Sequence, residues 1–285
     1  YGKEFAKAID YEREKKINDA VLRILTLKYE LGVFENPYAD ETFAFNATKA
    51  SDLALNAAEE SAVLLKNDGI LPLKKHMKIA LMGTHADEVV CGDYTFFSTV
   101  EDRCESIRSI LEKNIKQLIY TKGCDYSGCT EIQLEQAEAA ARKSDAVIIA
   151  VGDNSNFFGG VGWGRKDGEM FVNCGEGFDV SDLDLLQSNK TLIDRIYKTG
   201  KPIVLLVFSG CPMTYRKEME KCRACFQCWY LGERTGTAIY NLLYGSVVPS
   251  GKLPVSFPRS VGNLPCYYNH KVSARGYYRK RGSDE

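Results

Sequence analysis

Short apolar runs alternate with amphipathic stretches along most of the chain, and this alternation constrains the fold more than any other feature. The apolar runs lie at residues 78–83, 117–120, 146–151, 202–207 and 224–230. Runs that are apolar at almost every position and are separated by helical stretches are typical of a mostly parallel sheet covered by helices on both faces. The sequence therefore predicts a three-layer α/β sandwich, which we place at residues 49–266.

Helices are predicted before and between these strands. The first has apolar side chains on one face, from Ile17 to Leu25, and Gly32 is suited to end it. Further helices are expected at residues 51–66, 131–143, 182–197 and 235–244. Thr130 and Gln133 have the spacing of a capping box at the start of the helix 131–143.

Composition excludes several classes of function. Lys and Arg number 37 against 38 Asp and Glu, a net charge of −1, which argues against a nucleic-acid partner held by a basic surface. No apolar run approaches the roughly 20 residues of a membrane helix, so we expect no membrane partner. The ten cysteines are irregularly spaced, and we interpret most of them as buried free thiols. This favours a cytoplasmic protein, with secretion left open because the chain starts at Tyr1 without an initiator Met.

Three features could suggest a metal or cofactor site, and the sequence context argues against each of them. Cys222-x-x-Cys225-x-x-Cys228 resembles a metal-binding run, but residues three apart in a strand point to opposite faces, so Cys225 and Cys228 cannot meet at one metal. The glycine-rich stretch 159–164 is not followed by a predicted helix that could bind phosphate. Of the three histidines, His85 is the best placed, after a predicted strand. We expect no metal and no cofactor.

The loop that follows the strand 146–151 is the best candidate for a functional site. Open α/β sheets bind ligands beyond the carboxyl ends of their strands. This loop extends to about Val180, and loops of that length are usually functional or disordered. Near its end, Glu176 stands between Gly175 and Gly177, where a flexible backbone can bring a carboxylate close to a ligand.

Several segments, taken in order, resemble glycoside hydrolase family 3, the group that contains β-glucosidases and β-xylosidases. The segments are Tyr29–Tyr38, Glu60–Leu73, Cys91-Gly92-Asp93-Tyr94, Cys174–Asp179, Trp229-Tyr230-Leu231-Gly232-Glu233, Pro249–Pro258 and Leu264–Lys271. The match departs from the family pattern at Leu231, where proline is usual. It extends over nearly the whole chain.

The resemblance implies a retaining β-glycosidase that removes terminal β-linked glucose or xylose from oligosaccharides or glycosides. In this family a barrel domain provides an Asp nucleophile and the sandwich provides a Glu as acid/base, two carboxyl groups that must lie about 5–5.5 Å apart. Glu176 is the candidate acid/base, with Glu169 as runner-up because these loops vary in length. Trp163 and Phe157 are candidates for sugar binding.

The resemblance also implies an organisation of the chain. Residues 1–35 correspond to the end of the barrel domain, 36–48 to a linker, 49–266 to the sandwich and 267–285 to a tail that leads to a missing module. The nucleophile and the rest of the barrel are expected outside this chain, so the chain alone is expected to be inactive. An alternative stays open, in which the sandwich is a non-catalytic carbohydrate-binding or structural module.

Overall fold

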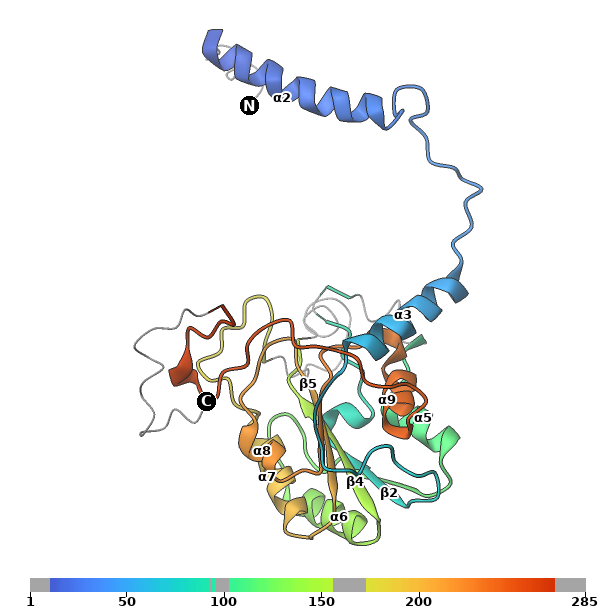
Figure 1. Ribbon diagram of the computed structural model, residues 1–285, viewed down its shortest axis with the longest axis vertical. Helices are drawn as coiled ribbons and strands as arrows, with labels where there is room; N and C mark the ends of the chain where they lie inside the picture. The colour runs from blue at the N-terminus through green and yellow to red at the C-terminus, as the bar shows by residue number, and fades with distance from the viewer. Residues whose placement is uncertain (1–10, 93, 96–102, 156–172, 270–285) are drawn as a thin grey trace. The chain divides into compact units, whose positions relative to one another are not determined.

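The computed structural model describes residues 11–92, 94–95, 103–155 and 173–269, and it divides the chain into two compact units, 1–47 and 48–285 (Figure 1). The first unit contains helix α2 (Tyr11–Glu30). Gly32 follows the helix with φ of 67°, and the Val33 N–H donates to the Lys28 carbonyl, which is the pattern of a glycine-ended helix. The predicted helix end at Gly32 is therefore confirmed.

The second unit, here called the α/β unit, is built on one sheet. Its strands in the described residues are β1 (Val63–Asn67), β2 (Ile79–Met82), β3 (Leu118–Tyr120), β4 (Ala146–Gly152), β5 (Ile203–Phe208) and β6 (Ala224–Gln227). They lie in the order β1-β6-β5-β4-β2-β3. All neighbours are parallel except β1, which pairs antiparallel with β6 at one edge.

Helices cover both faces of this sheet, as Figure 1 shows. Helices α3 (Ala47–Ser61), α5 (Ile107–Asn114) and α9 (Thr235–Tyr244) pack on one face, and α6 (Glu131–Arg142), α7 (Gln187–Tyr197) and α8 (Arg216–Glu220) on the other. Alternate residues of one strand enter different cores: Ile148 lies in the first and Ile149 in the second. The strands read as continuous apolar runs because both faces are buried. The predicted α/β sandwich is confirmed.

Two helix predictions were wrong at one end. The predicted helix 51–66 stops at Ser61, because the next residues form β1, with Val63 opposite Gln227 in β6. The predicted helix 182–197 begins only at Gln187, because Asp184 forms an isolated bridge with Thr214 that holds the preceding segment extended. In both cases pairing with a distant segment overrides local helical pattern.

Other local predictions hold. The Thr130 side chain accepts from the Gln133 N–H while the Gln133 side chain accepts from the Thr130 N–H, so the capping box is present. Helix α9 ends at Gly245 in a left-handed conformation. Helices α5 and α8 were not predicted, and neither were the short 3₁₀ helices η1 (Thr84–Ala86), η3 (Gly232–Arg234) and η4 (Val261–Asn263). No helix among the described residues has the length and apolar character to cross a membrane.

The strand order marks the place where a site is expected. From β2 the chain goes to β3 on one side, then returns to β4 on the other side of β2. Beyond the carboxyl ends of β2 and β4 the connections therefore leave in opposite directions, which creates the crevice where open α/β sheets bind ligands. The segments that begin at Gly83 and at Asp153 both start there.

Candidate active site

Glu176 lies in a tight turn whose shape depends on the glycines beside it. The Phe178 N–H donates to the Gly175 carbonyl at 3.1 Å, which closes a four-residue turn with Glu176 as its second residue. Gly175 and Gly177 have φ of 106° and 81°, a conformation that side-chain-bearing residues rarely adopt. The turn leaves Glu176 exposed to solvent, so its carboxylate is available to a ligand or to another domain.

The loop that carries this turn is closed at its base by two asparagines. The Asn154 N–H donates to Oδ1 of Asn173 at 2.7 Å, and the Asn173 N–H donates to the Asn154 carbonyl at 3.0 Å. Asn154 is buried and lies two residues after the end of β4. The position at which the chain returns before Glu176 is therefore fixed to the end of the central strand.

A buried network of hydrogen bonds around Asp153 contacts the segment that carries the turn. Asp153 is 1% exposed, and its two carboxylate oxygens accept hydrogen bonds from the Tyr230 hydroxyl at 2.6 Å and the Ser209 hydroxyl at 2.8 Å. The Tyr230 oxygen also lies 3.5 Å from Sγ of Cys174, two residues before Glu176. Burial, and then the Asp153 charge, raise the pKa of Tyr230 far above its usual value, so the phenol stays protonated and donates. Residues that follow β4, β5 and β6 thus anchor the turn.

The backbone after β6 aims Tyr230 at this network. Trp229 has φ of 56°, a left-handed conformation that is uncommon for a large side chain. Its ring packs edge-on against Phe257, with 5.8 Å between ring centroids. This sharp turn places the next residue, Tyr230, within reach of Asp153.

Tyr94 makes a direct contact with the candidate acid/base. Its hydroxyl donates a hydrogen bond to Oε2 of Glu176. Tyr94 is 67% exposed and belongs to the Cys91-Gly92-Asp93-Tyr94 motif, which follows β2. Segments after β2 and β4, which the strand order places at one crevice, therefore meet at Glu176.

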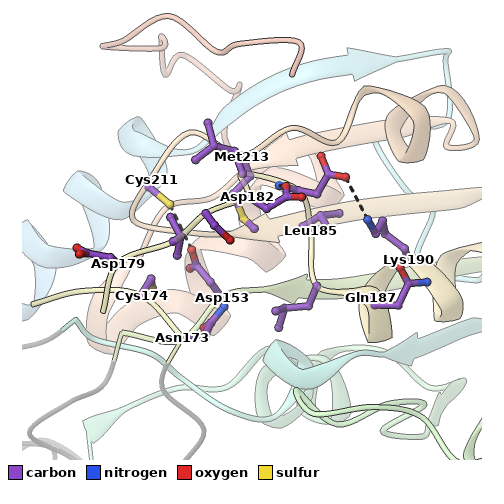
Figure 2. A pocket seen from close by; sticks show the side chains of 15 residues that line it. Asp153, Asn173, Cys174, Asp179, Asp182, Leu185, Gln187, Lys190, Cys211 and Met213 are labelled. Carbon is purple, nitrogen blue, oxygen red and sulfur yellow. Dashed lines mark hydrogen bonds and ion pairs between the residues drawn. The ribbon is translucent and has the colours of Figure 1, made fainter. Parts of the chain in front are cut away.

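A cavity of about 400 Å³ lies beside the network and is drawn in Figure 2. It lies at the carboxyl ends of β4 and β5. Its described lining is Asp153, Asn173, Cys174, Asp179, Val180, Ser181, Asp182, Leu183, Asp184, Leu185, Leu186, Gln187, Lys190, Cys211 and Met213. Lys190 pairs with Asp184 at 3.1 Å on one wall, and Cys174 and Asp179, from the stretch that carries Glu176, form another.

His85 takes no part in acid/base chemistry near neutral pH. It lies in η1 and is 1% exposed, with its ring stacked on Phe208 at 5.1 Å between centroids and edge-on to Tyr126 at 5.7 Å. Burial lowers its pKa to about 3, against a smaller opposing effect of a hydrogen bond with the Asp153 backbone. The imidazole is therefore neutral in the fold, and its position after β2 is structural.

The cysteine motif does not converge. Cys225 lies in the core on the face of the sheet that α6, α7 and α8 cover, and Cys228 lies in the core on the other face. Burial raises the pKa of Cys222 to about 12, so this thiol stays protonated. Among the described residues, no three His, Cys, Asp or Glu side chains gather where they could hold a metal ion.

Glu176 is the one predicted site residue that the structure describes. Glu169, Trp163 and Phe157 lie outside the described residues. Sequence reasoning missed Asp153, Ser209 and Tyr230. A usable signal was present, since each is a polar residue within three positions of the end of a buried strand.

Comparisons with known proteins agree with the motifs. Residues 62–283 match the family described as glycosyl hydrolase family 3 C-terminal domain. A beta-xylosidase of Formosa agariphila is 34% identical, in an alignment that spans 93% of this chain and 37% of that protein. A periplasmic beta-glucosidase of Salmonella typhimurium is 30% identical, over 92% of this chain and 36% of that protein. The chain thus spans little more than a third of these relatives.

Solved structures give the same result. The beta-glucosidase of Listeria innocua in complex with isofagomine superposes with a TM-score of 0.75 at 30% identity. The match covers 90% of this chain and 34% of that one.

Proposed function

The chain belongs to glycosyl hydrolase family 3, and we propose that its α/β unit provides the general acid/base of a retaining β-glycosidase. Relatives of this chain are named beta-xylosidase and beta-glucosidase, which supports a terminal β-linked xylose or glucose as the substrate. The second carboxylate, the nucleophile, is proposed to come from a barrel domain. The acid/base protonates the leaving oxygen, and it later activates the water that hydrolyses the glycosyl-enzyme.

The observation that carries this proposal is the placement of Glu176. Its carboxylate is exposed on a glycine turn, at the crevice where the strand order reverses, and it accepts a hydrogen bond from Tyr94. The turn is tied through Cys174 to the buried pair of Tyr230 and Asp153. An acid/base that must meet a group from another domain needs both access and a fixed position, and this arrangement offers both.

The assignment is tested in the enzyme that contains the barrel domain. Glu176→Ala is expected to reduce kcat about 10²–10⁴-fold on substrates with poor leaving groups. Activated aryl glycosides should react faster when azide is added, because azide attacks the glycosyl-enzyme without general-base help. Glu135→Ala, which changes an exposed glutamate on α6, is the matched control and should leave kcat unchanged.

Glu169→Ala decides between the two candidates. A normal rate for Glu176→Ala, together with a severe loss and azide rescue for Glu169→Ala, would move the acid/base to Glu169. The 285-residue chain alone should not hydrolyse nitrophenyl β-glucoside or β-xyloside, because it is proposed to hold one of the two carboxylates. Robust turnover by that chain would contradict the division between domains.

A further inference from the structure

Two thiols lie against each other in the connection that precedes α5. Sγ of Cys91 and Sγ of Cys104 are 3.6 Å apart, and the two residues are 13 positions apart in the sequence. Both side chains are half-buried. A disulfide needs sulfur atoms about 2.05 Å apart, so the thiols need to approach by roughly 1.5 Å.

The structure already holds the two cysteines near each other by other contacts. On the Cys104 side, the Glu105 N–H donates to the Glu233 carbonyl at 2.8 Å, and the Gly236 N–H donates to the Glu105 carbonyl at 2.8 Å. On the Cys91 side, Asp87 accepts a hydrogen bond from the Ser106 hydroxyl at 3.0 Å and pairs with Arg108 at 3.0 Å. These contacts hold the segment after Cys104 next to the segment before Cys91, so a bond between the two thiols requires little further ordering of these segments.

We propose that Cys91 and Cys104 form a reversible disulfide in which a low-molecular-weight disulfide such as oxidised glutathione is the oxidant. One thiolate attacks the oxidant and releases one glutathione thiolate, and the other cysteine then displaces the second. The two protein thiols lose two electrons and two protons, and the oxidant is reduced to two thiols. The bond fixes Cys91 to the segment that leads into α5.

This bond also has a consequence for the site. Cys91 is three residues from Tyr94, the hydrogen-bond donor to Glu176. The disulfide therefore restrains the backbone next to Tyr94. The bond itself does not depend on the role of Glu176, but its effect on the site rests on the proposed function. Burial, with the nearby Cys104 and Glu233, raises the pKa of Cys91 to about 12, so oxidation is expected to be slow at neutral pH and faster at higher pH.

Mass spectrometry of the full 285-residue chain tests the bond without any enzyme activity. The chain is equilibrated with glutathione mixtures of rising oxidised fraction, alkylated and digested with trypsin. Cleavage after Lys78, Arg103 and Arg108 separates the two cysteines into peptides 79–103 and 104–108. The expected result is a pair of these peptides joined by a disulfide, with complete loss of the joined pair after reduction.

Variants make the result decisive. Cys104→Ser should abolish the joined pair, whereas Cys266→Ser, which removes the exposed cysteine, should leave it unchanged. Two outcomes overturn the proposal. One is a glutathione adduct on Cys91 or on Cys104 with no joined pair of peptides. The other is that both thiols are still alkylated in a glutathione mixture that has fully oxidised Cys266. A joined pair that forms in the full-length enzyme without changing kcat would refute only the consequence for Glu176. Inactivity of that enzyme in both redox states would count against the proposed function and not the disulfide.

Discussion

Protonation of His85 should be a principal cause of acid instability in the α/β unit. The imidazole is fully enclosed between Phe208 and Tyr126, and burial lowers its pKa to about 3. In the unfolded chain a histidine titrates near 6.5. The folded pKa is the lower of the two, so the unfolded state binds a proton that the fold excludes. The contribution of the neutral His85 to the free energy of unfolding is therefore fully present above about pH 6.5, and it is lost as the pH falls towards 3.

The size of the effect follows from the two pKa values. At pH 5 the unfolded histidine is almost fully protonated while the folded one is neutral. The lost free energy of unfolding is then RT ln(1 + 10^1.5), or about 2 kcal/mol. Because pH 5 lies well above the folded pKa, this value depends almost entirely on the unfolded pKa. With a urea m-value of about 2 kcal/mol per M, the midpoint of unfolding falls by roughly 1 M through this residue.

Urea unfolding followed by circular dichroism, at pH values from 7 to 5, measures this contribution. His85→Gln removes the titrating group. This variant is expected to be less stable at pH 7, but its free energy of unfolding should fall by about 2 kcal/mol less than that of the wild type between pH 7 and pH 5. His76→Gln changes an exposed histidine and is the control. Its free energy of unfolding should depend on pH in the same way as that of the wild-type chain. Equal pH slopes for the wild type and His85→Gln would refute the reasoning, because the proton taken up on unfolding would then bind elsewhere.

Three further substitutions test the fold, each by urea unfolding at pH 7. Gly83→Ala should cost about 3 kcal/mol or more, since its φ is 104° and an added Cβ would lie 2.0 Å from the Ala150 carbonyl oxygen; wild-type stability would show that the backbone there is wrong. Phe226→Ala should cost about 3–5 kcal/mol, because this side chain is fully buried in β6, and a loss below 1 kcal/mol would contradict that burial. Thr130→Ala should cost about 1 kcal/mol through loss of the capping box of α6, whereas no change would mean that the cap is not formed.

The central strands could be predicted from the sequence because their state depends on burial alone. Residues 146–151 and 203–207 are apolar at every position, and both faces of each strand are covered. Strand β1 could not be predicted in the same way. Its residues Val63 to Asn67 directly follow a helix, and only pairing with β6, far along the chain, makes them extended. A local pattern contains no information on that partner.

The site was predictable in part, for a related reason. Glu176 could be singled out as a candidate because its glycine neighbours are local in sequence, as is the backbone conformation that they allow. Asp153, Ser209 and Tyr230 come from three separate connections, and the sequence marks each of them only as a polar residue near the end of a buried strand. Their relation appears only when β4, β5 and β6 lie side by side, which brings the three connections to one edge of the sheet.

This division between local and distant contributions bears on the proposed role of Glu176. A carboxylate that must act across a domain boundary cannot be held by its own buried contacts, because those contacts would cover it. Here the buried residue is Cys174, two positions before Glu176. Cys174 is 8% exposed and contacts Tyr230, while Glu176 stays exposed on the turn that follows. Asp153, which accepts from neutral hydroxyl donors, keeps Tyr230 oriented towards Cys174 without placing a cation near the turn. These contacts fix the position of Glu176 within the α/β unit itself, and under the proposed function the barrel domain has to provide only the second carboxylate.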